Sequence, residues 1–298
     1  MDVVTLFKVV ILSLIEGITE FLPVSSTGHL ILANAFVGLS PQEFANAFSV
    51  IIQLGAILAV VVLYWNRLNP WHVSDQRRAM RPRRYAQWNT QTRVYYDLTH
   101  PEPTTIALWE RVIVGVLPAA VLGFLFDDLI DKYFMTVPVV AATLFIYGVA
   151  MIFIEKRNQA KGEPARFTAT HELPLAIAFQ IGLYQCLALI PGTSRSAATI
   201  IGAMLLGTSR VAAAEFSFFL AIPTMLGATF LKVVKNLGSF TLGQWGLIAL
   251  GFFLSFVVAY VVIRKFMDYV RRHDFTPFGV YRIVLSVVLV VWMALGRG

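Results

Sequence analysis

Long apolar stretches separated by short polar breaks make up most of the 298-residue chain. About 20 apolar residues in a helix are enough to span the hydrocarbon core of a bilayer. The pattern therefore predicts an all-α integral membrane protein with six to eight membrane segments. The apolar stretches fall at residues 3–15, 17–39, 44–64, 106–126, 138–154, 173–190, 197–207, 211–231, 243–263 and 277–296.

The composition agrees with this assignment and restricts the function classes. Hydrophobic residues make up 57% of the chain and charged residues 14%, against about 45–50% and about 25% in soluble domains. We expect one membrane domain over residues 1–298, with a first segment that is not a cleaved signal peptide because it contains Glu16 and Glu20. The single cysteine, Cys186, excludes an intrachain disulfide and a Cys-rich metal site. The net charge of +7 is typical of loops that face anionic lipid, so membrane lipids and not nucleic acid are the expected partners.

The two halves of the chain resemble each other. The similarity indicates two repeats, at about residues 1–154 and 169–298, because the polar breaks themselves are among the matching positions. A chance register within apolar sequence is the alternative. A shift of 168 residues superimposes Pro23 on Pro191, Ser26 on Ser194, and Phe48-Ser49 on Phe216-Ser217.

The distribution of positive charge predicts the topology. We interpret the Arg-rich segment 66–105 as a solvated cytoplasmic loop, and 155–172 and 264–275 then lie on the same side. With two arginines at helix ends, these regions hold 17 of the 24 Lys and Arg residues, which fits the positive-inside rule. The number of membrane crossings agrees with these loop positions only if 3–39 and 173–207 enter the membrane and return to the side from which they came. Each repeat is then one re-entrant hairpin plus three transmembrane helices, the repeats are inverted, and the first hairpin opens to the outside.

The first polar break, "EFLPVSSTGHL", begins at Glu20, one helical turn after Glu16. Glu16 and Glu20 are spaced i, i+4, so they share one face of a helix. A charge inside the membrane is expensive and needs a partner. We expect the pair to bind a divalent cation or to manage protons. The alternative is a pair of interfacial acids near a helix end, in contact with water.

The rest of this break carries the groups of an activated nucleophile. Ser25, Ser26, Thr27 and His29 place hydroxyls beside a base and a carboxylate. Ser and Thr also favour the start of a helix, where free N–H groups receive an anion. Both roles are compatible. His29 alone would more often be structural than catalytic.

The second break, "PGTSRSAAT", has the composition of an oxyanion site. Arg195 suits a bidentate contact to phosphate, with an ion pair to Glu16 or Glu20 as the structural alternative. Gly192 and its small neighbours allow close approach of the backbone. A metal-bound phosphate between the two breaks would satisfy both. The candidate phosphate-binding residues are Ser25, Thr27, Thr193, Ser194, Ser196 and Thr199.

Other polar residues are weaker candidates. We expect Glu215 to pair with Arg210 at a helix end. Hydrogen bonding between helices is the expected role of four further polar residues, with a place in the cavity lining as the alternative: Gln53, Gln180, Tyr184 and Gln185. Asp127, Asp128 and Asp131 are expected in a solvated outer loop.

Three motifs together resemble the bacterial undecaprenyl-diphosphate phosphatase family, which is associated with bacitracin resistance. They are "EGITEFLPVSSTGHL", "QCLALIPGTSRSAATI" and "AAAEFSFFLAIP", and the resemblance covers nearly the whole chain. It implies a phosphatase of the bacterial cell membrane that recycles the lipid carrier for peptidoglycan synthesis. It also implies roles for Glu16 and Glu20 in binding Mg²⁺ or Ca²⁺, for Ser26 as nucleophile, and for Glu20, His29 and Arg195 in catalysis. Ser194 and Thr199 fall on the second motif.

Several alternatives remain open at this stage. Inverted repeats with broken helices are also typical of transporters, so a lipid-phosphate flippase or transporter is the alternative function. A type-2 phosphatidate phosphatase is rejected because no His or Asp follows Arg195 at the required spacing. The sequence does not separate attack by Ser26 from attack by a metal-activated water. It also leaves open whether a second copy of the chain is a partner, in a homodimer.

Overall fold

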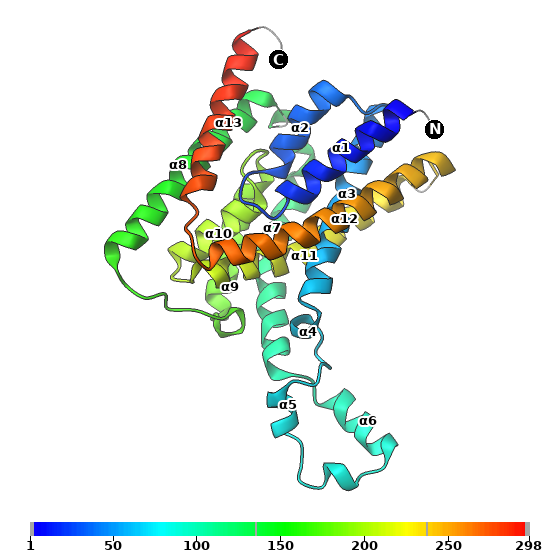
Figure 1. The fold of residues 1–298 in the computed structure, drawn as a ribbon, viewed down its shortest axis with the longest axis vertical. Helices are drawn as coiled ribbons and strands as arrows, with labels where there is room; N and C mark the ends of the chain where they lie inside the picture. The colour runs from blue at the N-terminus through cyan, green and yellow to red at the C-terminus, as the bar shows by residue number, and fades with distance from the viewer. Residues whose placement is uncertain (1–2, 135, 237, 296–298) are drawn as a thin grey trace.

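Helices make up almost all of the computed structural model, which describes residues 3–134, 136–236 and 238–295 (Figure 1). Within these ranges there is no β-strand, only an isolated bridge between Phe167 and Thr208. Six of the described helices are long and apolar enough to cross a membrane, in agreement with the predicted all-α membrane protein. They are α3 (Gln42–Leu63), α7 (Pro103–Tyr133), α8 (Val137–Lys161), α11 (Arg210–Asn236), α12 (Leu242–Val270) and α13 (Thr276–Ala294).

Four shorter helices form two hairpins. One consists of α1 (Val3–Thr19) and α2 (Ser26–Val37), the other of α9 (Leu175–Cys186), the turn η3 (Leu187–Leu189) and α10 (Arg195–Leu205). A helix of 12 residues is about 18 Å long, shorter than the hydrocarbon core of about 30 Å. Neither α2 nor α10 is therefore long enough to cross alone. In each half a hairpin precedes three long helices, whereas the inverted orientation and the repeat boundaries stay predictions.

Close helix crossings hold the bundle together. Helix α12 packs against α3 and α1, α13 against α8, α7 against α9, and α11 against α3 and α10. Glycines stand where backbones meet: a Cβ on Gly55 of α3 would lie 2.2 Å from the carbonyl oxygen of Phe252 on α12. A Cβ on Gly182 of α9 would lie equally close to the carbonyl oxygen of Gly115 on α7. Small residues that let backbones approach are the usual means of helix association in membranes.

Residues 66–105 form a folded projection at the end of the molecule opposite the start of α1 and the end of α13 (Figure 1). The segment interpreted as a solvated loop thus contains short helices, and its position on the cytoplasmic side stays a prediction. Arg77 lies at its centre, only 4% exposed, and donates hydrogen bonds to the carbonyl oxygens of Trp71, Asp97 and His100. The helical pieces of the projection are α4 (Trp65–Leu68), α5 (Asp75–Ala79), η1 (Tyr85–Gln87) and α6 (Thr90–Thr99).

Two expectations from the sequence were wrong. Residues 127–131 lie in α7 rather than in a loop, because the aspartates lower the hydropathy but no proline or glycine ends the helix there. Glu215 pairs with Arg67 at 2.6 Å, and Arg210 pairs with Glu155 at 2.7 Å. Positions five apart on a helix point about 140° away from each other, so Arg210 and Glu215 do not share a face.

Candidate active site

Each hairpin turns at a serine that caps the following helix. Ser25 accepts a hydrogen bond from the backbone N–H of Gly28, and Ser194 accepts one from Ala197. Both serines have positive φ, 74° and 71°, which is uncommon for residues other than glycine. Strained backbone of this kind persists where the surroundings enforce it, often at functional sites. The capping role expected for this break is confirmed.

The caps also correct the alignment of the two halves. Ser25 and Ser194 are 169 positions apart, one more than the shift found in the sequence. The second turn contains one extra residue between its proline and its cap. Ser26 therefore corresponds in space to Arg195, the first residue of α10, and not to Ser194.

A chain of polar contacts joins the two turns. The Oγ of Ser26 donates a hydrogen bond to Oε2 of Glu20 at 2.7 Å. The other carboxylate oxygen, Oε1, accepts one from Nη2 of Arg195 at 3.2 Å. All three side chains are largely buried. A serine hydroxyl that donates to a carboxylate has the geometry of a nucleophile with its base.

Arg195 also contacts α11, through a hydrogen bond to Ser217. Its Nη1 donates to the carbonyl oxygen of Ser217 at 2.8 Å, and Thr199 donates to the Oγ of Ser217 at 2.7 Å. The ion pair with Glu20, the structural alternative for this arginine, is thus present. It does not remove Arg195 from the site, because the same side chain lines the cavity described next.

A cavity of about 120 Å³ lies between the two turns. Four of the predicted site residues line it with Arg195, so the structure brings this part of the predicted site together. Gln53 of α3 also lines it, although its expected role was a hydrogen bond between helices. The amide of Gln53 has no hydrogen-bond partner among the described residues. The lining residues are Glu20, Ser26, Thr27, Gln53, Ala188, Pro191, Gly192, Ser194, Arg195 and Met225.

Glu16 lies one helical turn before Glu20, with no exposed surface. Neither of its carboxylate oxygens has a hydrogen-bond partner in the described part of the chain. In that part, no three His, Cys, Asp or Glu side chains are placed to hold a metal ion together. Mg²⁺ is usually bound by one or two carboxylates with substrate phosphates and water. Glu16 and Glu20 fit such a minimal set of oxygen donors.

His29 lies outside the cavity lining, and both of its ring nitrogens are occupied. Nδ1 is 2.7 Å from the carbonyl oxygen of Ser25, and Nε2 is 2.6 Å from the hydroxyl of Tyr281. A carbonyl oxygen only accepts, so Nδ1 carries the proton and Nε2 of the neutral ring accepts from Tyr281. In this arrangement Glu20, and not His29, is positioned to accept the proton of Ser26.

Arg282 on α13 joins the backbones of both turns, a role that the sequence reasoning missed. It has no exposed surface, and it donates to the carbonyl oxygens of Pro23, Gly192 and Thr193 at 3.2, 2.9 and 2.9 Å. A charged residue inside an apolar stretch is normally functional. That signal was available in the sequence, but it did not show that Arg282 contacts the two predicted turns, because these contacts are long-range.

The remaining predicted residues support the turns. Gly192 has φ +86°, and a Cβ there would lie 2.2 Å from Oγ1 of Thr143, so this position requires glycine. Ser196 donates to the carbonyl oxygen of Leu22 in the first turn. Thr193 is fully buried, and its hydroxyl has no hydrogen-bond partner within the described ranges.

The family model described as bacitracin resistance protein BacA matches residues 9–288. The chain belongs to this family. A BacA-family relative from Fusobacterium nucleatum subsp. nucleatum, named undecaprenyl-diphosphatase, is 50% identical over 95% of this chain and 98% of its own length. Undecaprenyl-diphosphatase 1 of Clostridioides difficile is 47% identical over 97% of both chains. An Enterococcus faecalis undecaprenyl-diphosphatase is 43% identical over 99% of both chains. The match to the BacA family includes both turns and Arg282.

Proposed function

We propose that this BacA-family protein hydrolyses undecaprenyl diphosphate to undecaprenyl phosphate and inorganic phosphate. The observation that carries the proposal is the hydrogen-bonded array of Ser26, Glu20 and Arg195 in a cavity within the membrane bundle. Full-length relatives named undecaprenyl-diphosphatase support the same substrate. Regeneration of the monophosphate returns the lipid carrier to cell-wall synthesis, and the family is described as one of bacitracin resistance proteins.

In the proposed first step, Ser26 attacks the terminal phosphorus. Its proton passes to Glu20, the Oγ–P bond forms, and the bond from phosphorus to the bridging oxygen breaks. Undecaprenyl phosphate then leaves. Water then attacks the phosphoserine, a new O–P bond forms as the P–Oγ bond breaks, and Glu20 returns its proton to the departing Oγ. The product is released as dihydrogen phosphate, which keeps both protons of the water and loses one of them to solvent at neutral pH. Direct attack by water on the terminal phosphorus is the competing mechanism.

Fixed positive groups would stabilise the charge that develops on the phosphoryl oxygens. Arg195 faces the cavity, and the first turns of α2 and α10 begin beside it. Helix N-termini favour anions through free N–H groups and the helix dipole. We propose Mg²⁺ or Ca²⁺ at Glu16 and Glu20, which would supply further neutralisation of the diphosphate when bound.

We also propose that the protein lies in the bacterial cell membrane with this site open to the outer side. The support is the excess of Lys and Arg in and around the projection and in the two other segments predicted to be cytoplasmic. Labelling of single cysteines in intact cells tests the orientation. A cysteine in the projection that reacts with an impermeant reagent from outside would contradict it.

Phosphate release from a C55 isoprenyl diphosphate by purified protein in detergent tests the activity. We expect release that a chelator suppresses and that Ser26→Ala, Glu20→Ala and Arg195→Ala each reduce strongly. Binding without release would contradict the enzyme and favour the lipid-phosphate transporter. Near-full turnover by Ser26→Ala would rule out the serine nucleophile and leave direct attack by water.

A further inference from the structure

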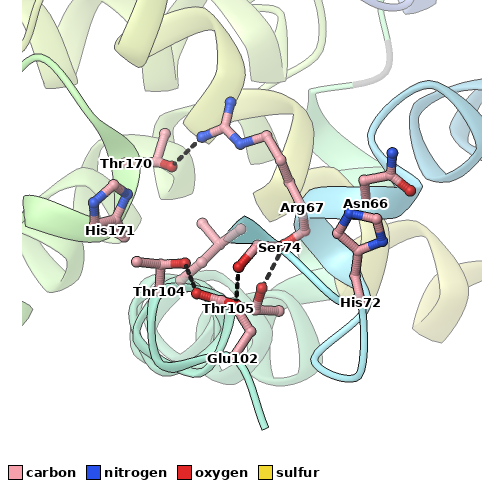
Figure 2. A pocket seen from close by; sticks show the side chains of 10 residues that line it. Asn66, Arg67, His72, Ser74, Glu102, Thr104, Thr105, Thr170 and His171 are labelled. Atoms are coloured by element: carbon pink, nitrogen blue, oxygen red, sulfur yellow. Dashed lines mark hydrogen bonds between the residues drawn. The ribbon is translucent and has the colours of Figure 1, made fainter. Parts of the chain in front are cut away.

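A second cavity, of about 290 Å³, lies at the base of the projection (Figure 2). It shares no residue with the active-site cavity, and nine of its ten lining residues are polar. Three parts of the chain meet there: the segment after α3, the start of α7, and the turn η2 (Thr170–Glu172). The lining residues are Asn66, Arg67, His72, Ser74, Glu102, Thr104, Thr105, Leu108, Thr170 and His171.

Arg67 holds the walls of this cavity in place. Its guanidinium donates to Glu215 on α11 at 2.6 Å and to the hydroxyl of Thr170 at 3.0 Å. The backbone oxygen of Arg67 accepts from Thr105 at 3.2 Å. The cavity is therefore built by contacts between both halves of the chain rather than by the chance position of one loop.

The side chains around Arg67 have unused hydrogen-bonding capacity. His72 and His171 stand on opposite sides of the cavity in Figure 2, with Arg67 between them. Neither imidazole, nor the amide of Asn66, makes a hydrogen bond or ion pair with any residue that the structure describes. Guanidinium, imidazole and amide N–H groups are the donors that bind oxyanions.

Glu102 restricts which oxyanion fits. It is only 4% exposed, and its carboxylate accepts hydrogen bonds from Ser74 and Thr104. A fully deprotonated anion is repelled by this charge. Hydrogen phosphate keeps one O–H group at neutral pH and can donate it to a carboxylate, whereas sulfate has no proton to donate. Phosphate monoesters lose theirs above about pH 6.

We propose that this cavity is a binding site for inorganic phosphate, separate from the active site. Arg67, His72 and His171 donate to the phosphate oxygens, and Glu102 accepts the remaining P–OH proton. The site thus combines three hydrogen-bond donors, one guanidinium and two imidazoles, with one carboxylate acceptor. This combination selects hydrogen phosphate over sulfate and over a monoester dianion.

Carbethoxylation of histidines with diethyl pyrocarbonate, followed by peptide mass spectrometry, tests the site in the full-length protein in detergent. We expect millimolar phosphate at pH 7.5 to slow modification of His72 and His171 at least threefold. His100 and His273 are exposed and do not line the cavity, so their rates should not change. Sulfate at equal ionic strength, and an alkyl monophosphate at the same pH, should give no protection.

Two variants sharpen the test. Arg195→Ala removes a phosphate ligand of the proposed active site but should leave protection of His72 and His171 intact, which separates the two proposals. Glu102→Gln removes the negative charge at nearly unchanged size, so sulfate should then protect as well as phosphate. Absence of protection by phosphate, or equal protection by sulfate in the unmodified protein, would overturn the proposal.

Discussion

Gln53 illustrates how a single polar side chain in an apolar helix acquires a function from its surroundings. It lines the active-site cavity, and its amide makes no hydrogen bond to a described residue. A polar group at this depth needs a partner. The bound diphosphate or a water molecule can provide one, so Gln53 joins the candidate site residues.

Gln53→Ala should therefore reduce the stabilisation of the transition state. A hydrogen bond to a charged group contributes about 1.5–3 kcal/mol, which corresponds to a loss in kcat/KM of about 10- to 100-fold. Steady-state phosphate release measures it. Gln180→Ala is the matched control, because Gln180 is exposed on α9 and away from the cavity. Unchanged kcat/KM in Gln53→Ala would remove Gln53 from the site.

His29 is a second single residue with a role at the site, and that role is to hold the first turn in position. Its ring connects the first turn to α13 through Tyr281, while Glu20 contacts Ser26. Tyr281→Phe deletes one hydrogen bond of about 0.5–1.5 kcal/mol, so we expect kcat to fall about two- to tenfold. The acid limb of the pH–rate profile, which is the range where the rate falls as the pH is lowered, should not shift in pH. A displaced limb would show that His29 titrates in catalysis. Tyr260→Phe on α12 serves as the control.

At the scale of elements, α13 sets the distance between the two turns. The guanidinium of Arg282 on this helix donates hydrogen bonds to backbone carbonyl oxygens of both turns. Lysine keeps the charge but lacks the planar fork of donors. Arg282→Lys leaves at least one buried carbonyl without a donor, at a cost of about 1–3 kcal/mol.

We expect Arg282→Lys to lower both the thermal unfolding midpoint in detergent and kcat, with Arg282→Met more affected in each. Arg264→Lys provides the comparison, because Arg264 is exposed on α12. Wild-type stability and turnover in Arg282→Lys would show that the turns hold their positions without it.

The projection has its own pH dependence. Partial burial acts to raise the pKa of Asp97, but hydrogen bonds from Tyr85 and Arg81 and nearby guanidinium charges outweigh it and hold the pKa below its ordinary value. A lowered pKa in the folded state contributes stability above the unfolded value of about 3.9, and that contribution fades as pH falls below it.

The protection of the α6 amides against hydrogen exchange, measured relative to the intrinsic exchange rate at each pH, should therefore fall below about pH 4. The amides of α8 are the internal reference. Asp97→Asn should show fast α6 exchange already at neutral pH. Equal protection of α6 in Asp97→Asn and the unmodified protein would contradict the assignment.

At the scale of the whole molecule, Glu155 joins segments that are far apart in the sequence. This carboxylate on α8 is 1% exposed. It accepts from Nε and Nη2 of Arg210 on α11 and from the backbone N–H of Phe275 before α13. Both hydrogen-bond partners lie in the second half of the chain, so Glu155 connects that half to the end of the first.

Glu155→Ala removes the hydrogen bonds from Arg210 and Phe275, and we expect it to destabilise the fold by about 1.5–3 kcal/mol. The loss is limited because the side chain of Arg210 is 36% exposed and regains contact with water in the variant. Thermal unfolding in detergent gives the measurement. Glu163→Ala is the control, since Glu163 is exposed beyond the end of α8. An unchanged unfolding midpoint would show that the helices pack without this connection.

Local patterns in the sequence are enough to predict the membrane class and the two polar breaks, and to nominate most of the side chains proposed for the site. These depend on local properties: the length of an apolar run, the position of a proline, and the cost of Glu20 or Arg195 in lipid. The family resemblance rests on the same local motifs, and the BacA match confirms it.

Which of these groups meet depends on the packing of the helices, which is not visible in the local patterns. Glu215 contacts Arg67 and not Arg210, His29 turns to Tyr281, and Arg282 reaches both turns. Each of these contacts joins positions at least 89 residues apart in the chain. Helical periodicity places a side chain on a face, but the packing of α11 and α13 decides what that face meets.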